Sequence, residues 1–148
     1  MPIYFHTTVD AYGCFSNFSR HGFELVGRYW PTVEHYFQSQ KFVGTVYEAH
    51  VVCARTPKEA AARGRSRAHP IRADWEAVKD EVMRIAVRRK FAVNVDIPAG
   101  LLGTADEELV ENAPGDYYWG CGADGSGRNM LGRILMEVRD ELRQGVGL

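Results

Sequence analysis

The spacing of apolar residues along this chain predicts that most of it is helical. From Trp75 to about Ala92, apolar side chains recur every three or four residues, as they do on the buried face of an α-helix. The segment from about Asn129 to Gln144 repeats this spacing. The expected core positions are Trp75, Val78, Val82, Ile85 and Ala86 in the first segment and Leu131, Leu135, Val138 and Leu142 in the second.

Capping signals set the expected ends of the helices. Asp74 is a suitable N-cap for the long helix. Thr56-Pro57-Lys58-Glu59 has the pattern of a capping box and opens a helix through Arg63, which Gly64 ends. Cations crowd the C-terminal half of the long helix, where the helix dipole favours them; they are Arg84, Arg88, Arg89 and Lys90. Further helices are expected at about Thr32 to Val43, at Val46 to Ala54 and from Asp96-Ile97-Pro98 to Gly103.

Few segments have the character of strands. Ile3 to Phe5 and Glu108 to Glu111 are short candidates, and Phe23 to Tyr29 alternates weakly around Gly27, as in a hairpin. We therefore expect an α+β fold, predominantly helical and compact, with a few short strands. At 148 residues the chain has the size of a single domain, and residues 1–148 show no internal repeat or linker.

Composition narrows the class of protein. The formal net charge of −1 argues against a dedicated nucleic-acid wrapper. No apolar run approaches the roughly 20 residues that span a membrane, and the N-terminus lacks the features of a signal peptide. Three widely spaced cysteines and five histidines match neither a disulfide framework nor a metal motif. We expect a cytoplasmic protein without a bound metal or cofactor.

The segment from Trp30 to Phe42 is the most informative. In a helix, Glu34, Gln38 and Lys41 fall within an arc of roughly 60°, flanked by Phe37 and Phe42. A solvated charged face is one interpretation. However, Glu34 and Lys41 would stand about 10 Å apart along the axis, too far for a local ion pair. The alternative is a buried polar pocket, where burial raises the pKa of a carboxyl and lowers that of a lysine.

Two other clusters combine aromatic and polar residues. Phe15-Ser16-Asn17-Phe18 either places an amide and a hydroxyl at a pocket edge or is a turn with two core anchors. Asp116-Tyr117-Tyr118-Trp119-Gly120 either forms a stacking platform for a flat base or supplies ordinary core aromatics.

Two segments could bind phosphate. The Gly-rich loop from Gly120 to Asn129 precedes a helix N-terminus and contains Arg128, although such loops are often simple connectors. The basic sequence Arg63-Gly64-Arg65-Ser66-Arg67 is either a phosphate grip or a solvated turn.

Together these segments resemble the NADAR (YbiA-like) family. The resemblance rests on Phe15-Ser16-Asn17-Phe18, on Trp30-Pro31-Thr32-x-Glu34-His35-Tyr36-Phe37-Gln38-x-Gln40-Lys41-Phe42, on Ala61-x-x-Gly64-Arg65, on Trp75, on Tyr118-Trp119-Gly120 and on Gly127-x-Asn129-x-Leu131-Gly132. It extends from about Ile3 to Leu142. It implies a compact, mostly helical fold and N-glycosidase activity.

The resemblance also implies roles for individual residues. Glu34 would be the acid/base residue, Lys41 the reactive lysine and Asp116 a further polar catalytic residue. The expected substrate-binding residues are Phe15, Asn17, Phe18, Gln38, Arg65, Trp75, Tyr118, Trp119, Gly127, Arg128 and Asn129.

Three functions remain open at this point. The first is hydrolysis of the C1′–N bond in phosphoribosylamino-pyrimidines, which are early riboflavin intermediates. The second is removal of ADP-ribose from guanine bases of DNA or RNA, which predicts a basic groove beside the pocket. The third is non-catalytic binding of ADP-ribose, which would not require both Glu34 and Lys41.

Overall fold

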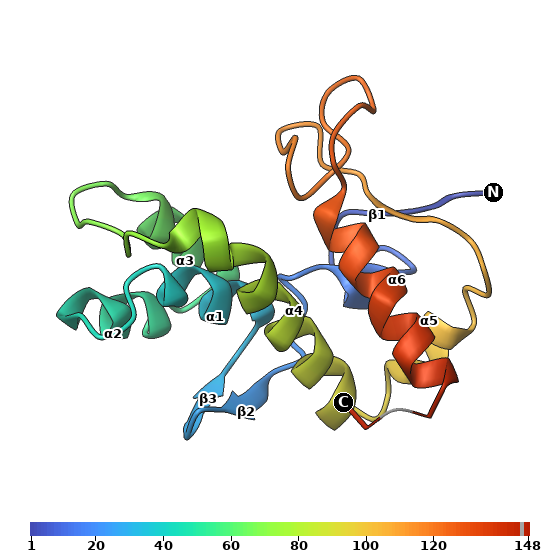
Figure 1. Ribbon diagram of the computed structural model, residues 1–148, viewed down its shortest axis with the longest axis horizontal. Coiled ribbons are helices and arrows are strands. Elements are labelled where there is room, and N and C mark those ends of the chain that lie inside the picture. Colours follow the sequence, from blue (N-terminus) through green and yellow to red (C-terminus); the bar gives the residue numbers. More distant parts are fainter. Residues whose placement is uncertain (146) are drawn as a thin grey trace.

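The computed structural model describes residues 1–145 and 147–148 and confirms a helix-rich α+β fold. Three short helices lie together at one side: α1 (Val33–Gln40), α2 (Val46–Val52) and α3 (Pro57–Arg65) (Figure 1). The long helix α4 (Trp75–Val93) crosses the middle, and α5 (Pro98–Leu102) and α6 (Met130–Arg143) lie on its other side (Figure 1). The loop between residues 112 and 129 projects beyond the N-terminal end of α6.

The strands form two small sheets. β1 (Ile3–Phe5) pairs in parallel with β4 (Leu109–Glu111), so that Phe5 lies opposite Glu111. β2 (Phe23–Leu25) and β3 (Arg28–Trp30) form the expected hairpin, with Gly27 at positive φ in the turn. The parallel pair joins the start of the chain to its C-terminal third.

A side-chain cap begins helix α1, and a tightened last turn ends it. The Thr32 hydroxyl accepts a hydrogen bond from the His35 amide at 3.1 Å, which caps the helix. At the other end, the amides of residues 41 to 43 bond to carbonyls three residues earlier, so the last turn tightens. The α-helix therefore stops at Gln40, before the expected Val43, and leaves Lys41 at its C-cap.

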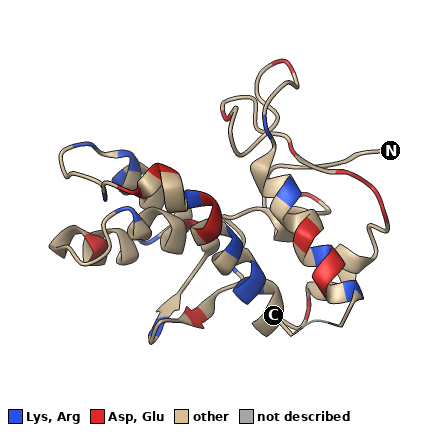
Figure 2. Ribbon diagram, in the orientation of Figure 1, with Lys and Arg blue, Asp and Glu red and all other residues tan. Residues whose placement is uncertain are grey.

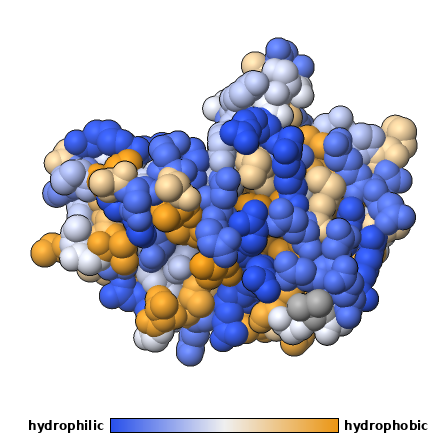
Figure 3. Space-filling model, viewed as in Figure 1, coloured by the Kyte–Doolittle hydropathy of each residue, from blue (hydrophilic) through white to orange (hydrophobic). Residues whose placement is uncertain are grey.

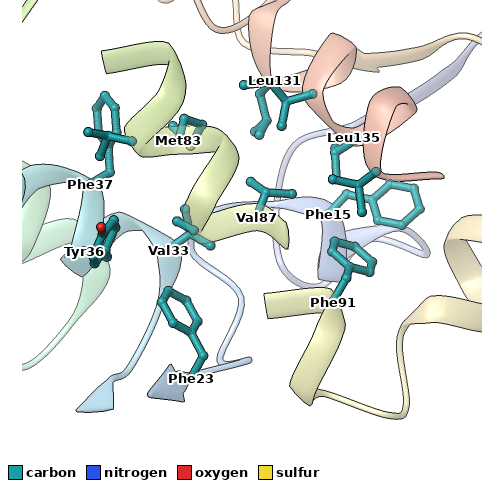
Figure 4. Packing of buried hydrophobic residues seen from close by; sticks show 14 of the residues in the cluster. Phe15, Phe23, Val33, Tyr36, Phe37, Met83, Val87, Phe91, Leu131 and Leu135 are labelled. Atoms are coloured by element: carbon teal, nitrogen blue, oxygen red, sulfur yellow. The ribbon is translucent and has the colours of Figure 1, made fainter. Parts of the chain in front are cut away.

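The core lies on both sides of α4, where it packs against α1 and against α6 (Figure 4). Val82, Met83, Ala86 and Val87 of α4 are buried there, and Leu131, Leu135 and Val138 confirm the stripe expected for α6. Ile85 was wrongly expected in the core: it is 37% exposed.

Lys90, one of the cations near the C-terminal end of α4, lies in the interior. Its side chain is 1% exposed, and its ammonium donates a hydrogen bond to the Ser16 carbonyl at 3.0 Å. Burial lowers the pKa of Lys90 to about 7. The charge pattern of the sequence could not show that this position of α4 faces the interior.

Two helix ends differ in detail from the expectation. Asp74 occupies the N-cap position of α4, but its carboxylate accepts hydrogen bonds from Arg72 and caps no amide. Gly64 was expected to end α3, yet the helix continues to Arg65. The reason is that Gly64 lies against Gln38 of α1, where a Cβ atom would be 2.6 Å from the Gln38 Cβ.

The viewed face of the molecule is mainly hydrophilic, with apolar patches between the polar side chains (Figure 3). Arg84 and Arg88 of α4 form ion pairs with Glu137 and Glu141 of α6. Within the described residues, none of the helices combines the length and the apolar character needed to cross a bilayer.

Candidate active site

A cavity of about 1320 Å³ opens between α1, the loop before β2 and the segment after β4. Its polar lining comes from parts of the chain that are far apart in sequence. Of the residues expected in the site, it brings together Asn17, Phe18, Glu34, Gln38, Lys41, Arg65, Asp116 and Trp119.

One wall is the face of α1 that carries Glu34, Gln38 and Lys41. All three side chains are buried, as the flanking aromatics predicted. The Gln38 amide nitrogen donates to Glu34 Oε1 at 2.7 Å, while Gln38 Oε1 is buried without a partner among the described residues. Burial raises the pKa of Glu34, and the Gln38 hydrogen bond, Arg65 and Lys41 oppose this shift.

Lys41 is held as a weakly basic amine at the end of α1. Its Nζ donates to the Gly64 carbonyl at 3.4 Å and lies 5.9 Å from the ring centroids of Phe37 and Trp75. Burial and the nearby Arg67 lower the pKa of Lys41 to about 8. Glu34 and Lys41 have separate hydrogen-bond partners in the described chain and do not pair with each other. A useful fraction of Lys41 is therefore a free amine near neutral pH.

The opposite wall contains Asp116 and a residue that the sequence analysis missed, Glu111. Asp116 Oδ1 accepts hydrogen bonds from the amides of Tyr118 and Trp119, which fixes the turn that follows it. Glu111 ends β4, and burial, Asp116 and Glu34 raise its pKa to about 8. The sequence offered only a short apolar strand ending in an acid. Its place beside the cavity follows from pairing with β1, which the local pattern does not encode.

The Phe15–Phe18 segment divides between core and cavity. Asn17 lines the cavity, where its Nδ2 contacts Met83 Sδ at 3.5 Å and its buried Oδ1 has no partner within the described chain. Phe18 lies beside it. Phe15 was expected to bind substrate but does not line the cavity: it is 1% exposed and packs edge-on against Phe5.

Trp75, Tyr118 and Trp119 were expected to bind substrate. Of these three aromatic residues, only Trp119 lines the cavity. It meets Phe37 edge-to-face at a centroid distance of 5.2 Å. Trp75 lies behind Phe37 in the core, 5.0 Å away, and Tyr118 turns outward to donate to Asp80. Trp75 and Tyr118 thus support the wall and do not form its surface.

The Gly-rich loop does not form the phosphate site that its sequence suggested. The amides of Arg128, Met130 and Leu131 donate to the carbonyls of Tyr117, Tyr118 and Trp119, so these N–H groups at the start of α6 are already satisfied. The Arg128 guanidinium lies over the Tyr118 ring at 4.9 Å. Gly127, Arg128 and Asn129 line a separate cavity of about 230 Å³.

Asn129 has a structural function that explains its place in the motif. Its backbone is left-handed, with φ of 52°, and its side chain accepts from the Glu111 amide at 2.9 Å and donates to the Leu109 carbonyl at 2.8 Å. Asn129 therefore ties the start of α6 to β4 and fixes the backbone of Glu111.

The chemistry that these groups allow is acid–base and nucleophilic. A buried amine, a buried carboxyl that accepts a hydrogen bond and a second carboxyl without a donor face one cavity. In the described part of the chain, no three His, Cys, Asp or Glu side chains are grouped as metal ligands.

Comparison with known proteins shows the family to which the chain belongs. The NADAR domain model matches residues 4–143. An N-glycosidase of Nostoc punctiforme is 52% identical, over 97% of this chain and 94% of that protein. A riboflavin biosynthesis protein of Vibrio vulnificus is 41% identical, over 97% of this chain but 39% of that protein. The NMR structure of the Escherichia coli protein YbiA has a TM-score of 0.88 and 45% identity, covering 97% of this chain and 85% of that one.

The sequence motifs, the shared fold and the relatives lead to the same assignment. The match covers the helix with Glu34 and Lys41 as well as the segment with Glu111 and Asp116. The chain is an N-glycosidase enzyme and belongs to the NADAR domain family.

Proposed function

We propose that this enzyme hydrolyses the bond between ribose C1′ and the exocyclic amine of a phosphoribosylamino-pyrimidine. The observation that carries the proposal is that Lys41 and Glu34 face one cavity without pairing with each other. A relative named a riboflavin biosynthesis protein supports this class of substrate.

The substrate's chemistry explains why a lysine is useful. A ribose joined to an exocyclic amine can open to an imine, unlike an ordinary nucleoside. Lys41, which burial keeps partly neutral, attacks C1′ and displaces the base by imine exchange. Water then adds to C1′ and releases ribose phosphate from Lys41. Glu34 moves protons between the departing amine, water and the enzyme.

The remaining lining residues orient the substrate. Trp119 offers an aromatic surface to the pyrimidine ring. The unpartnered Oδ1 of Asn17 accepts a hydrogen bond from a ribose hydroxyl. Arg65, at the exposed end of α3, binds the phosphate. Arg128 no longer belongs to this group, because it lines the separate small cavity.

Reduction of the reaction mixture tests the covalent step. Borohydride added with substrate should leave a stable phosphoribosyl adduct on Lys41, detected by peptide mass spectrometry, and Lys41→Ala should be inactive. An active Lys41→Ala together with no adduct would exclude the covalent route and leave direct hydrolysis by Glu34 and Asp116, a two-carboxyl mechanism.

The size of the cavity favours a second candidate substrate. Ligand cavities usually occupy about 300–1,000 Å³, and this one, at about 1320 Å³, is larger. It also extends past Arg20 and His21, away from Lys41. The alternative function is therefore removal of ADP-ribose from guanine bases. The name of the Nostoc punctiforme relative, an N-glycosidase, favours catalysis over non-catalytic binding of ADP-ribose.

Direct comparison of the two substrate classes decides between them. Purified enzyme is incubated with each substrate, and the released base is measured by mass spectrometry. We expect pyrimidine release, and no release by Glu34→Ala. Release of guanine alone would reject the pyrimidine proposal in favour of the alternative.

A further inference from the structure

Glu111 contributes a carboxyl group to the cavity that the proposed roles of Glu34, Lys41 and Asp116 leave unused. Its backbone is fixed: the amide donates to Asn129 Oδ1, and the carbonyl accepts from the amides of Ala113 and Cys121, each at 2.9 Å. Its Oε2 atom, by contrast, is fully enclosed and has no hydrogen-bond partner among the described residues. A buried polar atom held in a rigid frame without a partner is costly unless it has a function.

The surroundings of Glu111 and Glu34 differ in the hydrogen bonds that they offer to a carboxylate. Burial, Asp116 and Glu34 all raise the pKa of Glu111, to about 8. Burial also raises the pKa of Glu34, but the Gln38 hydrogen bond and the charges of Arg65 and Lys41 stabilise its carboxylate. Two carboxyl groups whose environments separate their titrations commonly divide acid and base roles. Glu34 accepts a hydrogen bond from Gln38, whereas Glu111 Oε2 has no donor among the described residues, so Glu111 is the carboxyl that suits the proton-donating role.

We propose that Glu111 is the general acid that protonates the leaving exocyclic nitrogen, and that Glu34 acts as the base toward water. This inference rests on the proposed function and divides between two residues a task first given to Glu34 alone. It applies equally to a pyrimidine and to a guanine leaving group, because both depart as amines.

Atoms and charges balance in each step. As the C1′–N bond breaks, its electron pair goes to the nitrogen, and the proton of Glu111 completes the free amine. C1′ bonds to Lys41 Nζ, and the proton that Lys41 loses restores Glu111. Water then adds to C1′, Glu34 takes a proton from that water, and Lys41 leaves with a proton in turn. One water molecule is consumed for each bond cleaved, and no other reactant is needed.

Glu111→Gln is the sharpest test, because the amide keeps the shape of the protonated acid but cannot donate an acidic proton. We expect kcat to fall about 100-fold or more at pH 7, with KM changed less than about threefold. The deficit should shrink as the pH rises from 7 to 9.5, because wild-type Glu111 loses its proton around pH 8. Glu34, Lys41, Asp116 and Arg65 face the same cavity in both proteins, so effects of pH that do not involve Glu111 largely cancel in the ratio of the two rates.

Glu108→Gln is the matched control, since Glu108 lies three residues earlier, directly before β4, and its side chain is exposed. It should have wild-type kcat at every pH. A wild-type kcat for Glu111→Gln would overturn the inference, and so would a deficit that is the same at every pH, because a structural role predicts that result.

Further results distinguish a failure of the role of Glu111 from a failure of the proposed function. If Glu111→Gln does not fold, Glu111→Asp keeps the acid and should retain a reduced kcat that still declines above about pH 8; a profile without that decline overturns the inference. If wild-type enzyme releases base while Glu111→Gln is equally fast, the inference about Glu111 fails alone. If wild-type enzyme releases base from neither substrate class, the proposed function fails, and the role of Glu111 fails with it.

Discussion

At the scale of single residues, burial gives two lysines different functions. Lys41 faces the cavity, and in the proposed mechanism its lowered pKa makes it the nucleophile. Lys90 is enclosed in the core and lies outside the cavity lining, and its ammonium holds the Ser16 carbonyl, at the edge of the cavity. For Lys90 the desolvation of the charge is a cost in stability that the single hydrogen bond to Ser16 offsets only in part.

The pH dependence of stability should reveal this cost. The pKa of Lys90 is about 7 in the folded protein and near 10.5 when unfolded, so the unfolded state binds more protons between these values. The penalty is therefore full below pH 7 and disappears as the pH rises to about 10.5, at about 1.4 kcal/mol for each pKa unit. Lys90→Met removes it, so the variant should gain most over wild type at pH 6.5 and less at pH 9.5 in urea unfolding.

Lys58→Met at an exposed position is the control for this experiment. Its difference from wild type should be small at both pH values. A Lys90→Met difference that does not change with pH would contradict the buried, destabilising charge.

At the scale of secondary-structure elements, the site depends on the close approach of α1 and α3. Gly64 lies on Gln38, and a Cβ atom at this position would be 2.6 Å from Gln38 Cβ and 2.7 Å from Gln38 Cδ. Gln38 in turn donates to Glu34, and the Gly64 carbonyl accepts from Lys41. The spacing between the two helices therefore sets the positions of both catalytic candidates.

Gly64→Ala should consequently reduce both stability and activity. Overpacking of a close helix contact costs about 1–3 kcal/mol, and displacement of Gln38 disturbs the hydrogen bond to Glu34. The measurements are the free energy of unfolding and kcat. Gly100→Ala in α5 is the control, because a Cβ atom there meets nothing within 4 Å and should be neutral or slightly stabilising. Equal behaviour of the two variants would show that α1 and α3 tolerate a larger separation.

The junction of β4 with α6 provides a second element-scale prediction. Asn129→Ala removes both hydrogen bonds to β4 and places a residue with a Cβ but no polar group at a φ of 52°. A left-handed backbone alone costs about 1–2 kcal/mol, so we expect a loss of about 2–3 kcal/mol. Activity should also fall, because Glu111 loses its backbone support. Asn129→Gly restores the backbone freedom and should recover part of the stability but not the activity. Full activity in either variant would contradict the role of Asn129 in fixing the backbone of Glu111.

At the scale of the whole molecule, local sequence patterns predicted the secondary-structure elements. Contacts between residues distant in sequence determined which side chains line the cavity. Periodicity and capping located the helices, and the polar line Glu34, Gln38 and Lys41 marked one wall of the cavity. Glu111 was missed in the sequence analysis because its position depends on pairing between β1 and β4, which are more than 100 residues apart in the sequence. The loop from Gly120 to Asn129 was likewise expected to bind phosphate, but hydrogen bonds to the preceding segment already satisfy the amides at the start of α6. A single sequence carries no signal for either arrangement.

The charge of the whole molecule predicts how the reaction should respond to salt. The net charge is −1, and both α4 and α6 carry acidic as well as basic residues (Figure 2). A small phosphoribosyl substrate meets only the few cations at the cavity, such as Arg65, whereas binding to nucleic acid releases counterions for every phosphate contacted. We expect kcat/KM for the pyrimidine substrate to change less than about threefold between 50 and 200 mM salt. ADP-ribosylated oligonucleotides, measured in parallel, should be poor substrates at either concentration. Efficient turnover of the oligonucleotide with a decrease of tenfold or more over this range would identify nucleic acid as the substrate and reject the small-molecule assignment.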